Sequence, residues 1–152
     1  MNPAQEVCVD ASIAVKVVVT EPDSDKADAL FHEWANKGMQ LIAPAFFAAE
    51  TDSILRQKVM LRKELTPEQA ETAFAKLQAL PIQQIAMPGQ RQRAWEMAVG
   101  YGFATVYDAA YLALAELRGC EYWTADERLF HRVKATLTFV KCLQNYAEVG
   151  SE

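Results

Sequence analysis

The sequence has few residues of the types that build disulfides, zinc sites and catalytic histidines. Its three cysteines, Cys8, Cys120 and Cys142, are odd in number and form no C-x-x-C pair. This argues against a disulfide framework and a thiolate zinc site, and we expect the cysteines to be small buried hydrophobes in a reducing compartment. The two histidines, His32 and His131, lie far apart in charged surroundings. We expect both at the surface, outside any catalytic or metal-binding site.

Long apolar runs are also missing. No stretch approaches the roughly 18 apolar residues that a membrane-spanning helix needs. The first ten residues, MNPAQEVCVD, lack the basic and apolar segments of a secretory signal. We therefore expect a cytoplasmic protein with no membrane partner.

An excess of basic charge is absent as well, because the net charge is −5. Domains that hold RNA or DNA by a broad grip on phosphates are usually basic, which argues against generic nucleic-acid binding. An acidic balance instead suits a site that recruits divalent cations.

The chain is predicted to form a single domain over residues 1–152, because it has no internal repeat, low-complexity tract or linker. Short β-branched runs alternate with stretches whose apolar residues recur at helical spacing. This alternation predicts an α/β domain with a mostly parallel sheet, in which ligands bind beyond the carboxyl ends of the strands. The strands are expected over 6–10, 39–44, 81–88, 120–125 and 136–141. The helices are expected over 11–22 (whose valines also suit a strand), 24–38, 45–64, 66–80, 89–102, 106–119, 126–135 and 143–149.

Four acidic residues stand out along the chain: Asp10, Glu50, Asp108 and Asp126. Asp10 and Asp126 follow two of the expected strands, where a ligand site belongs. Each aspartate also has a local explanation. Asp10 and Asp126 could favour the start of the helix that follows, and Asp108 stands three residues after Thr105 in a capping-box-like pair. Both interpretations stay open for the three aspartates.

Glu50 has no such local explanation. At about 100° per residue, it shares a helix face with Phe47 and Leu61, whereas Asp52 falls on the polar side. Asp108 begins a helix that is apolar nearly all round, which is typical of a buried element. An inward glutamate and a buried aspartate, beside two strand-end aspartates, predict carboxylates that converge in one pocket.

Converging carboxylates repel one another unless a cation neutralises them. Oxygen ligands without histidine or cysteine favour Mg²⁺ or Mn²⁺ over Zn²⁺. Carboxylates that leave waters on such an ion allow metal-assisted phosphoryl transfer. Ser12 and Thr124 each lie two residues from an acid, and they either orient carboxylates and waters or serve only as local caps.

The four acids lie in the stretches VDASIAVK, APAFFAAETDSILR, YDAAYLALAE and TADERLF. In this order and spacing, the stretches resemble the PIN-domain nucleases, in particular the VapC-like toxins of type II toxin–antitoxin systems. No single stretch is specific, but with the order of the expected elements the likeness covers nearly the whole chain.

The resemblance implies a PIN-like three-layer α/β/α domain with a five-stranded parallel sheet and a Mg²⁺ or Mn²⁺ site. It implies an endoribonuclease that cuts single-stranded or loop RNA with a metal-activated water. It also implies a cognate antitoxin protein as partner and a homodimer that pairs through the helical hairpin at 41–80. The family's acidic positions are matched by Asp10, Glu50, Asp108 and Asp126, and its accessory polar positions by Ser12 and Thr124.

The sequence leaves alternatives to an endoribonuclease open. A non-catalytic acidic pocket of the same fold, which only binds a partner protein, is the main alternative. Aspartyl-phosphate chemistry of the haloacid-dehalogenase type needs a second aspartate where this chain has Ser12, and a phospho-receiver domain needs an acidic neighbour that Asp10 lacks. Basic residues at two helix ends could line a phosphate track or form solvated helix faces. They are Arg56, Lys58, Arg62 and Lys63 in one cluster and Arg128, Arg132 and Lys134 in the other.

Overall fold

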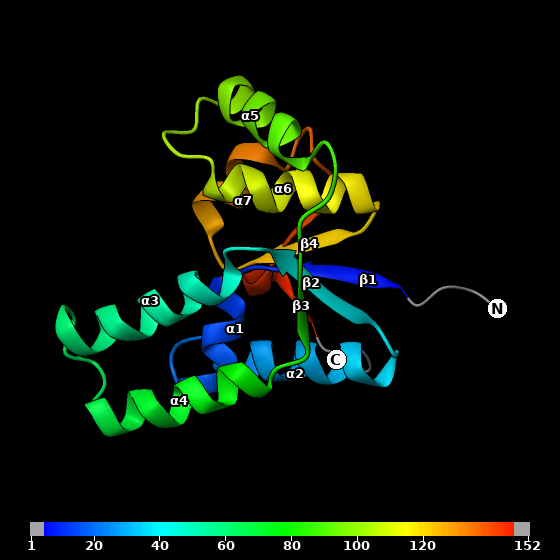
Figure 1. The fold of residues 1–152 in the computed structure, drawn as a ribbon. Coiled ribbons are helices and arrows are strands. Elements are labelled where there is room, and N and C mark those ends of the chain that lie inside the picture. The colour runs from blue at the N-terminus through cyan, green and yellow to red at the C-terminus, as the bar shows by residue number, and fades with distance from the viewer. Residues whose placement is uncertain (1–4, 148–152) are drawn as a thin grey trace.

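The structure, a computed structural model, describes residues 5–147. These residues form a five-stranded parallel sheet between two layers of helices (Figure 1), as the resemblance implied. The strands are β1 (Glu6–Val9), β2 (Gln40–Pro44), β3 (Ile82–Ile85), β4 (Glu121–Thr124) and β5 (Val140–Cys142). The helices are α1 (Ala11–Val18), α2 (Ser24–Asn36), α3 (Phe47–Met60), α4 (Pro67–Ala79), α5 (Gln90–Tyr101), α6 (Tyr107–Arg118), α7 (Glu127–Val133) and the short 3-10 helix η1 (Leu143–Asn145).

The order of the strands determines where a ligand can bind. It is β3-β2-β1-β4-β5, so the chain extends from β1 through β2 and β3 in one direction and resumes on the other side with β4. The order therefore reverses between β1 and β4, and open sheets bind ligands beyond the carboxyl ends of the strands at such a point. Val9 pairs with Trp123 at the end of these two strands, and the backbone N–H of Asp10 donates to the Trp123 carbonyl at 3.0 Å.

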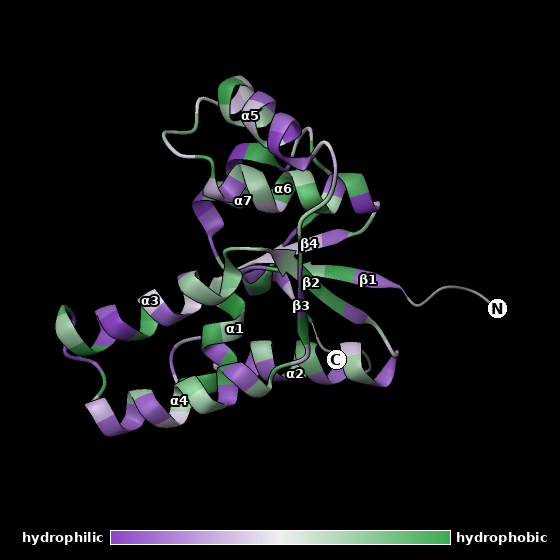
Figure 2. Ribbon diagram, viewed as in Figure 1, coloured by the Kyte–Doolittle hydropathy of each residue, from purple (hydrophilic) through white to green (hydrophobic). Residues whose placement is uncertain are grey.

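The two helical layers bury both faces of the sheet. In Figure 1, helices α1 to α4 lie on one side of the sheet and α5 to α7 on the other. Val7 and Val9 of β1 pack in a cluster with Leu30 and Trp34 of α2, whereas Cys8 belongs to the cluster that contains the buried residues of α6. Figure 2 shows much hydrophobic colour on β1 and β2 and much polar colour on α3 and α4. A central strand buried on both faces explains why its residues are apolar without alternation.

Helices α3 and α4 form a hairpin that extends from the sheet (Figure 1). Its second helix begins with a capping box: the Thr66 hydroxyl accepts from the Gln69 N–H at 3.1 Å, and the Gln69 side chain accepts from the Thr66 N–H at 2.9 Å. Pro67 follows at the first helical position, where its missing N–H has no cost. The turn that joins the helices is therefore defined locally by its sequence.

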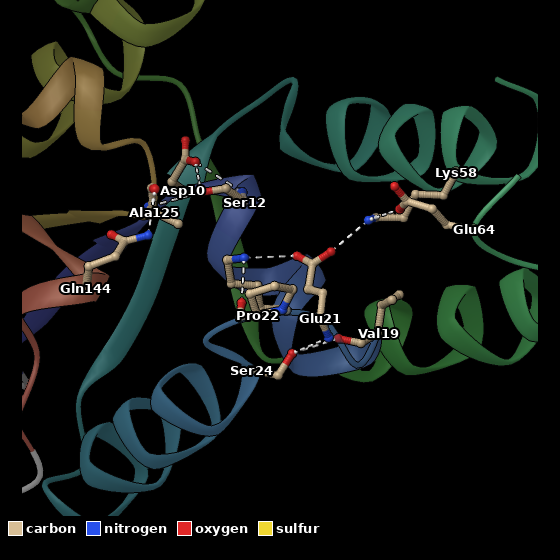
Figure 3. Close-up of polar contacts among 11 residues, drawn as sticks. Asp10, Ser12, Val19, Glu21, Pro22, Ser24, Lys58, Glu64, Ala125 and Gln144 are labelled. Atoms are coloured by element: carbon tan, nitrogen blue, oxygen red, sulfur yellow. Dashed lines mark hydrogen bonds and ion pairs between the residues drawn. The ribbon is translucent and has the colours of Figure 1, made fainter. Parts of the chain in front are cut away.

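An ion-pair network ties the far end of α3 to the loop after α1 (Figure 3). The Lys58 ammonium lies 2.7 Å from Glu21 Oε2 and 2.9 Å from Glu64 Oε2, and Lys16 lies 3.2 Å from Glu21 Oε1. Lys58 is only 5% exposed. Burial alone would lower its pKa, but the hydrogen bonds to Glu21 and Glu64 outweigh that effect and raise it. Lys58 is thus a charged structural residue, and it belongs neither to a phosphate track nor to a solvated helix face.

Several expected boundaries were wrong. The helix expected over 45–64 ends at Met60, and Leu61 is 76% exposed instead of lying on a buried face. The strand expected over 136–141 begins at Val140, and the last expected helix is a 3-10 turn over Leu143–Asn145. That helix was expected to run to residue 149, and residues 148–149 lie outside the described range. Within residues 5–147, no helix has the length and apolar character to cross a bilayer.

Candidate active site

All four predicted acids lie at the start of a helix, either as its N-cap or in its first turn. Asp10 caps α1 directly after β1, and Asp126 caps α7 after β4, while Glu50 and Asp108 lie in the first turns of α3 and α6. Burial is the main cause of the raised pKa values of Asp10, Glu50 and Asp108, and charge coupling adds to it. The charge of Asp126 contributes to the shift of Asp10, and the charge of Asp10 contributes to the shifts of Glu50 and Asp108. Carboxylates that perturb one another must lie near one another.

Asp10 is held through both of its carboxylate oxygens. Its Oδ2 accepts hydrogen bonds from the Ser12 N–H at 3.0 Å and from the Ser12 hydroxyl, and its Oδ1 accepts from the Tyr122 hydroxyl at 2.8 Å. The capping interpretation is therefore confirmed, and it accounts for one oxygen only. Burial raises the pKa of Asp10 above its ordinary value, although the hydrogen bonds from Ser12 and Tyr122 oppose the shift.

Glu50 points toward α6. Its Oε1 accepts a hydrogen bond from the Tyr111 hydroxyl at 2.6 Å, and the described residues provide no donor for Oε2. Burial raises the pKa of this carboxyl, and the charges of Asp10 and Asp108 add to the shift against the effect of Tyr111. The prediction that Glu50 points inward is therefore supported by its contact, even though Leu61, used to define that face, is exposed.

Asp108 lacks a partner within the part of the chain that the structure describes. Helix α6 begins at Tyr107 with Val106 as its N-cap and no side-chain capping bond, so the predicted capping box with Thr105 was wrong. Burial raises the pKa of Asp108 to about 6, and the charges of Asp10 and Asp126 act in the same direction. Because Asp108 makes no capping bond, local capping does not explain this residue. A partly buried carboxylate with no donor and no cation lowers the stability of a fold.

Asp126 lies in a loop that is anchored on both sides. The Ser12 hydroxyl accepts from the Ala125 N–H at 3.2 Å, and the Gln144 side-chain amide donates to the Ala125 carbonyl at 3.0 Å (Figure 3). The buried Thr124 hydroxyl accepts from the Asp126 N–H at 3.0 Å. Asp126 itself is exposed and caps α7 through the Leu129 N–H at 3.1 Å. Ser12 therefore links the two strand-end acids.

Two tyrosines that the sequence pattern did not single out contact the acids. Tyr111 and Tyr122 are fully buried, and their rings stack with centroids 5.4 Å apart at 28°. Burial first, and the charge of Asp10 next, raise the pKa values of both hydroxyls, which therefore stay protonated and act as donors. One sequence feature could have identified Tyr111, which follows Asp108 by three residues on an apolar helix. A tyrosine on such a helix is expected to be buried, and buried tyrosine hydroxyls usually have a hydrogen-bond partner.

The donor chemistry of the four acids fits a hard divalent cation. All four offer carboxylate oxygens, and no ion pair among residues 5–147 involves any of them. They do not form a ready-made cluster, because in this same range no three His, Cys, Asp or Glu side chains are grouped so as to hold an ion as they stand. Repulsion keeps unneutralised carboxylates apart, and two of these acids are turned toward tyrosines.

The remaining candidates have structural or surface positions. Cys8 and Cys142 are buried as expected, Cys120 is partly exposed, and His32 and His131 are exposed. In the second basic cluster, Arg132 donates to the carbonyls of Tyr101 and Gly102 and lies over the Phe103 ring. The exposed members of the two clusters are Arg56, Arg62, Lys63, Arg128, Arg132 and Lys134.

Comparison with known proteins identifies the family of this arrangement. Residues 7–135 match the family model of the PIN domain. The chain belongs to the PIN-domain family. This confirms the resemblance drawn from the four acidic stretches.

Proteins similar to this chain include VapC proteins of Mycobacterium tuberculosis. Ribonuclease VapC12 is 29% identical over 123 residues, covering 81% of this chain and 88% of VapC12. Ribonuclease VapC3 is 30% identical over 128 residues, covering 84% of this chain and 88% of VapC3. The crystal structure of VapC20, described as a toxin that cleaves the sarcin–ricin loop, matches with a TM-score of 0.61 at 18% identity, over 86% of this chain and 95% of that one. At that identity the match supports the fold.

Proposed function

We propose that this PIN-domain protein is a divalent-metal-dependent endoribonuclease, the toxin of a toxin–antitoxin pair. The observation that supports the proposal is the placement of the four acids. Asp10 and Asp126 follow β1 and β4, where the strand order reverses, Glu50 and Asp108 lie in the first turns of α3 and α6, and no ion pair within residues 5–147 neutralises them. The names of VapC12 and VapC3, both ribonucleases, support RNA as the substrate class. The activity ascribed to VapC20, cleavage of the sarcin–ricin loop, supports single-stranded or loop RNA.

Electrostatics require a cation between this pocket and its substrate. The phosphodiester backbone is anionic, and uncompensated carboxylates repel it. A divalent ion held here would supply an activated water at neutral pH and would stabilise the leaving oxygen. The residues that would hold Mg²⁺ or Mn²⁺ are Asp10, Glu50, Asp108 and Asp126.

The chain's own residues fix the orientation of this pocket. Ser12 and Tyr122 hold the Asp10 carboxylate, and Tyr111 holds Glu50. Thr124 holds the backbone before α7 by accepting a hydrogen bond from the Asp126 N–H. Asp108 has no donor within residues 5–147, so its oxygens are free to face an ion or a water.

Cleavage of purified tRNA and rRNA fragments tests this function. Asp10→Asn and Asp108→Asn should each abolish cleavage, because each removes a charge with little change in volume. Asp52→Asn is the matched control, since Asp52 lies two residues from Glu50 on α3 and makes no hydrogen bond or ion pair within residues 5–147. EDTA should stop the wild-type reaction and added Mn²⁺ should restore it. Undiminished cleavage in EDTA, or by either active-site variant, would refute the mechanism.

The same assay separates the alternative function. If the wild type binds Mn²⁺ but cleaves no RNA at any concentration, the protein is an acidic-pocket binding module of the same fold.

The acidic pocket also suggests how a protein partner would silence the enzyme. A carboxylate cluster attracts a guanidinium, which pairs with carboxylates through two parallel hydrogen bonds. We expect the cognate antitoxin to place an arginine in this pocket and to dock an apolar helix beside it. Replacing every arginine and lysine of its binding segment by glutamine should relieve inhibition. Full inhibition by the substituted segment would contradict this account.

A further inference from the structure

Two buried tyrosines join the acids of the pocket across elements that are distant in sequence. Tyr111 of α6 donates to Glu50 of α3, and Tyr122 of β4 donates to Asp10 at the end of β1. Their rings stack on each other, and the Phe46 ring packs edge-on against Tyr111 with centroids 5.7 Å apart. The hydroxyls thus lie at fixed points of a rigid core, each within hydrogen-bond distance of one carboxylate.

From this geometry we infer that Tyr111 and Tyr122 are positioning residues, which hold the Glu50 and Asp10 carboxylates in the orientation needed to bind the metal ion. The inference rests on the proposed function for its catalytic consequence. Partners that hydrogen-bond ligating carboxylates set the orientation of those ligands, and their loss typically costs about 10- to 100-fold in metal affinity or activity. Neither tyrosine is placed to touch substrate, because both side chains are fully buried.

The two tyrosines should differ in importance. Asp10 keeps the backbone and hydroxyl donors of Ser12 if Tyr122 loses its hydroxyl. Glu50 has Tyr111 as its single donor within the described residues. Glu50 is also a longer side chain with one more rotatable bond, so it gains more freedom when its donor is removed. Tyr111 is therefore the dominant positioning residue.

Phenylalanine substitutions isolate the hydroxyls from the rings. Tyr111→Phe and Tyr122→Phe keep the stacked ring pair and its volume. If the tyrosines served only to fill the core, these substitutions would leave the Glu50 and Asp10 carboxylates unaffected. Tyr101→Phe is the matched control, because the Tyr101 hydroxyl bonds to Thr136, outside the carboxylate pocket.

The first measurement needs no metal. Side-chain carbon relaxation of the apo protein reports how ordered Glu50 and Asp10 are. We expect Tyr111→Phe to increase the mobility of Glu50 and leave Asp10 unchanged. Tyr122→Phe should affect Asp10 only, and by less. Unchanged order of Glu50 in Tyr111→Phe would overturn the inference.

The second measurement is Mn²⁺ binding, followed by electron paramagnetic resonance of the free ion. Tyr111→Phe should weaken affinity about tenfold or more, Tyr122→Phe by a smaller factor, and Tyr101→Phe not at all. At saturating Mn²⁺, kcat should fall with KM for RNA unchanged. Wild-type affinity in Tyr111→Phe would overturn the positioning role. If the wild type binds no Mn²⁺, the proposed function fails instead, and the relaxation measurement still decides whether the tyrosine orders the carboxylate.

Discussion

Asp108 shows most directly that this pocket opposes the stability of the metal-free fold. Its pKa is raised from 3.8 to about 6 by burial and by the charges of Asp10 and Asp126. The folded protein therefore binds this proton more tightly than the unfolded chain does. Between pH 4 and 6 the unfolded chain loses the proton first, so the free energy of unfolding falls as pH rises through this window. Above about pH 6 the destabilisation is complete.

Replacing Asp108 by asparagine should therefore stabilise the apo protein at neutral pH. One pKa unit corresponds to about 1.4 kcal/mol, so the full shift sets a ceiling of about 3 kcal/mol. The gain at pH 7.5 lies below this ceiling, because solvent screens the partly exposed carboxyl, and it vanishes near pH 4. For a domain of this size, each kcal/mol shifts the melting temperature by roughly 2–4 °C. Thermal melts of wild type and Asp108→Asn in EDTA, across this pH range, check the expected trend.

Metal linkage provides the second half of the same experiment. An ion that binds only the folded state adds about 2.7 kcal/mol at a hundredfold excess over its Kd. Asp108→Asn should shrink the stabilisation by Mg²⁺, whereas the control Asp52→Asn should retain it. A variant that is no more stable than wild type at neutral pH, with an unaltered response to Mg²⁺, would show that Asp108 does not belong to the pocket.

The positions of the four carboxylates at the starts of helices could be predicted from the sequence, but the groups that hold them could not. The strand ends placed Asp10 and Asp126, and an apolar helix placed Asp108. Their partners could not be predicted in the same way. The Tyr122–Asp10 contact joins residues 112 positions apart, and the Tyr111–Glu50 contact joins residues 61 apart. Such pairs follow from how helices and strands pack, which local patterns do not specify.

Among the helices and strands, the end of α3 shows where periodicity failed. Apolar spacing favoured Leu61 as a buried residue, yet the chain buries Lys58 and exposes Leu61. The reason is that Glu21 and Glu64 neutralise the lysine, and its long apolar stem packs in the helix interface while the ammonium reaches them. The start of α4 was predictable because its cap is made within four residues.

This network makes a specific prediction for the α3–α4 hairpin. Lys58→Met keeps the apolar stem and removes the charge, so Glu21 and Glu64 lose their shared partner. We expect the free energy of unfolding to fall by about 2 kcal/mol. This is less than the roughly 3–5 kcal/mol for breaking a fully buried pair, because Glu21 keeps Lys16 and Glu64 is half exposed. Chemical denaturation measures the change.

Lys76→Met is the matched control for this variant. Lys76 lies on α4, is exposed and makes no ion pair within residues 5–147. A loss of stability equal to that of Lys58→Met would show that the buried network contributes nothing beyond a surface lysine.

For the whole molecule, the alternation of strands and helices predicted the topology of the sheet more reliably than it predicted where each element begins and ends. Every expected strand exists, although β5 begins four residues later than expected. The start of β5 was harder to predict because part of the apolar run TLTFVK lies in the turn before it. Leu137 in this turn is buried by tertiary packing. The late start of β5 does not affect the predicted site, because the positions of Asp10 and Asp126 depend on the ends of β1 and β4.

Exposed apolar side chains predict association of two whole molecules. Met60, Leu61 and Phe74 of the α3–α4 hairpin are 53%, 76% and 37% exposed. Gathered on one projecting hairpin, they are the kind of surface that marks a protein interface. We expect light scattering at micromolar concentration to give twice the monomer mass of 17.0 kDa. Leu61→Ser combined with Phe74→Ser should give the monomer without loss of helical content, because both side chains are exposed in one chain.

Leu117→Ser tests whether the effect is specific to the hairpin, since Leu117 is 40% exposed on α6. It should leave the dimer intact. Trp95 and Val99 form a second exposed apolar pair on α5, at 62% and 65%. If Trp95→Ser dissociates the dimer and the hairpin variant does not, the molecules pair through α5. A wild type that runs only as a 17.0 kDa species would contradict the homodimer itself.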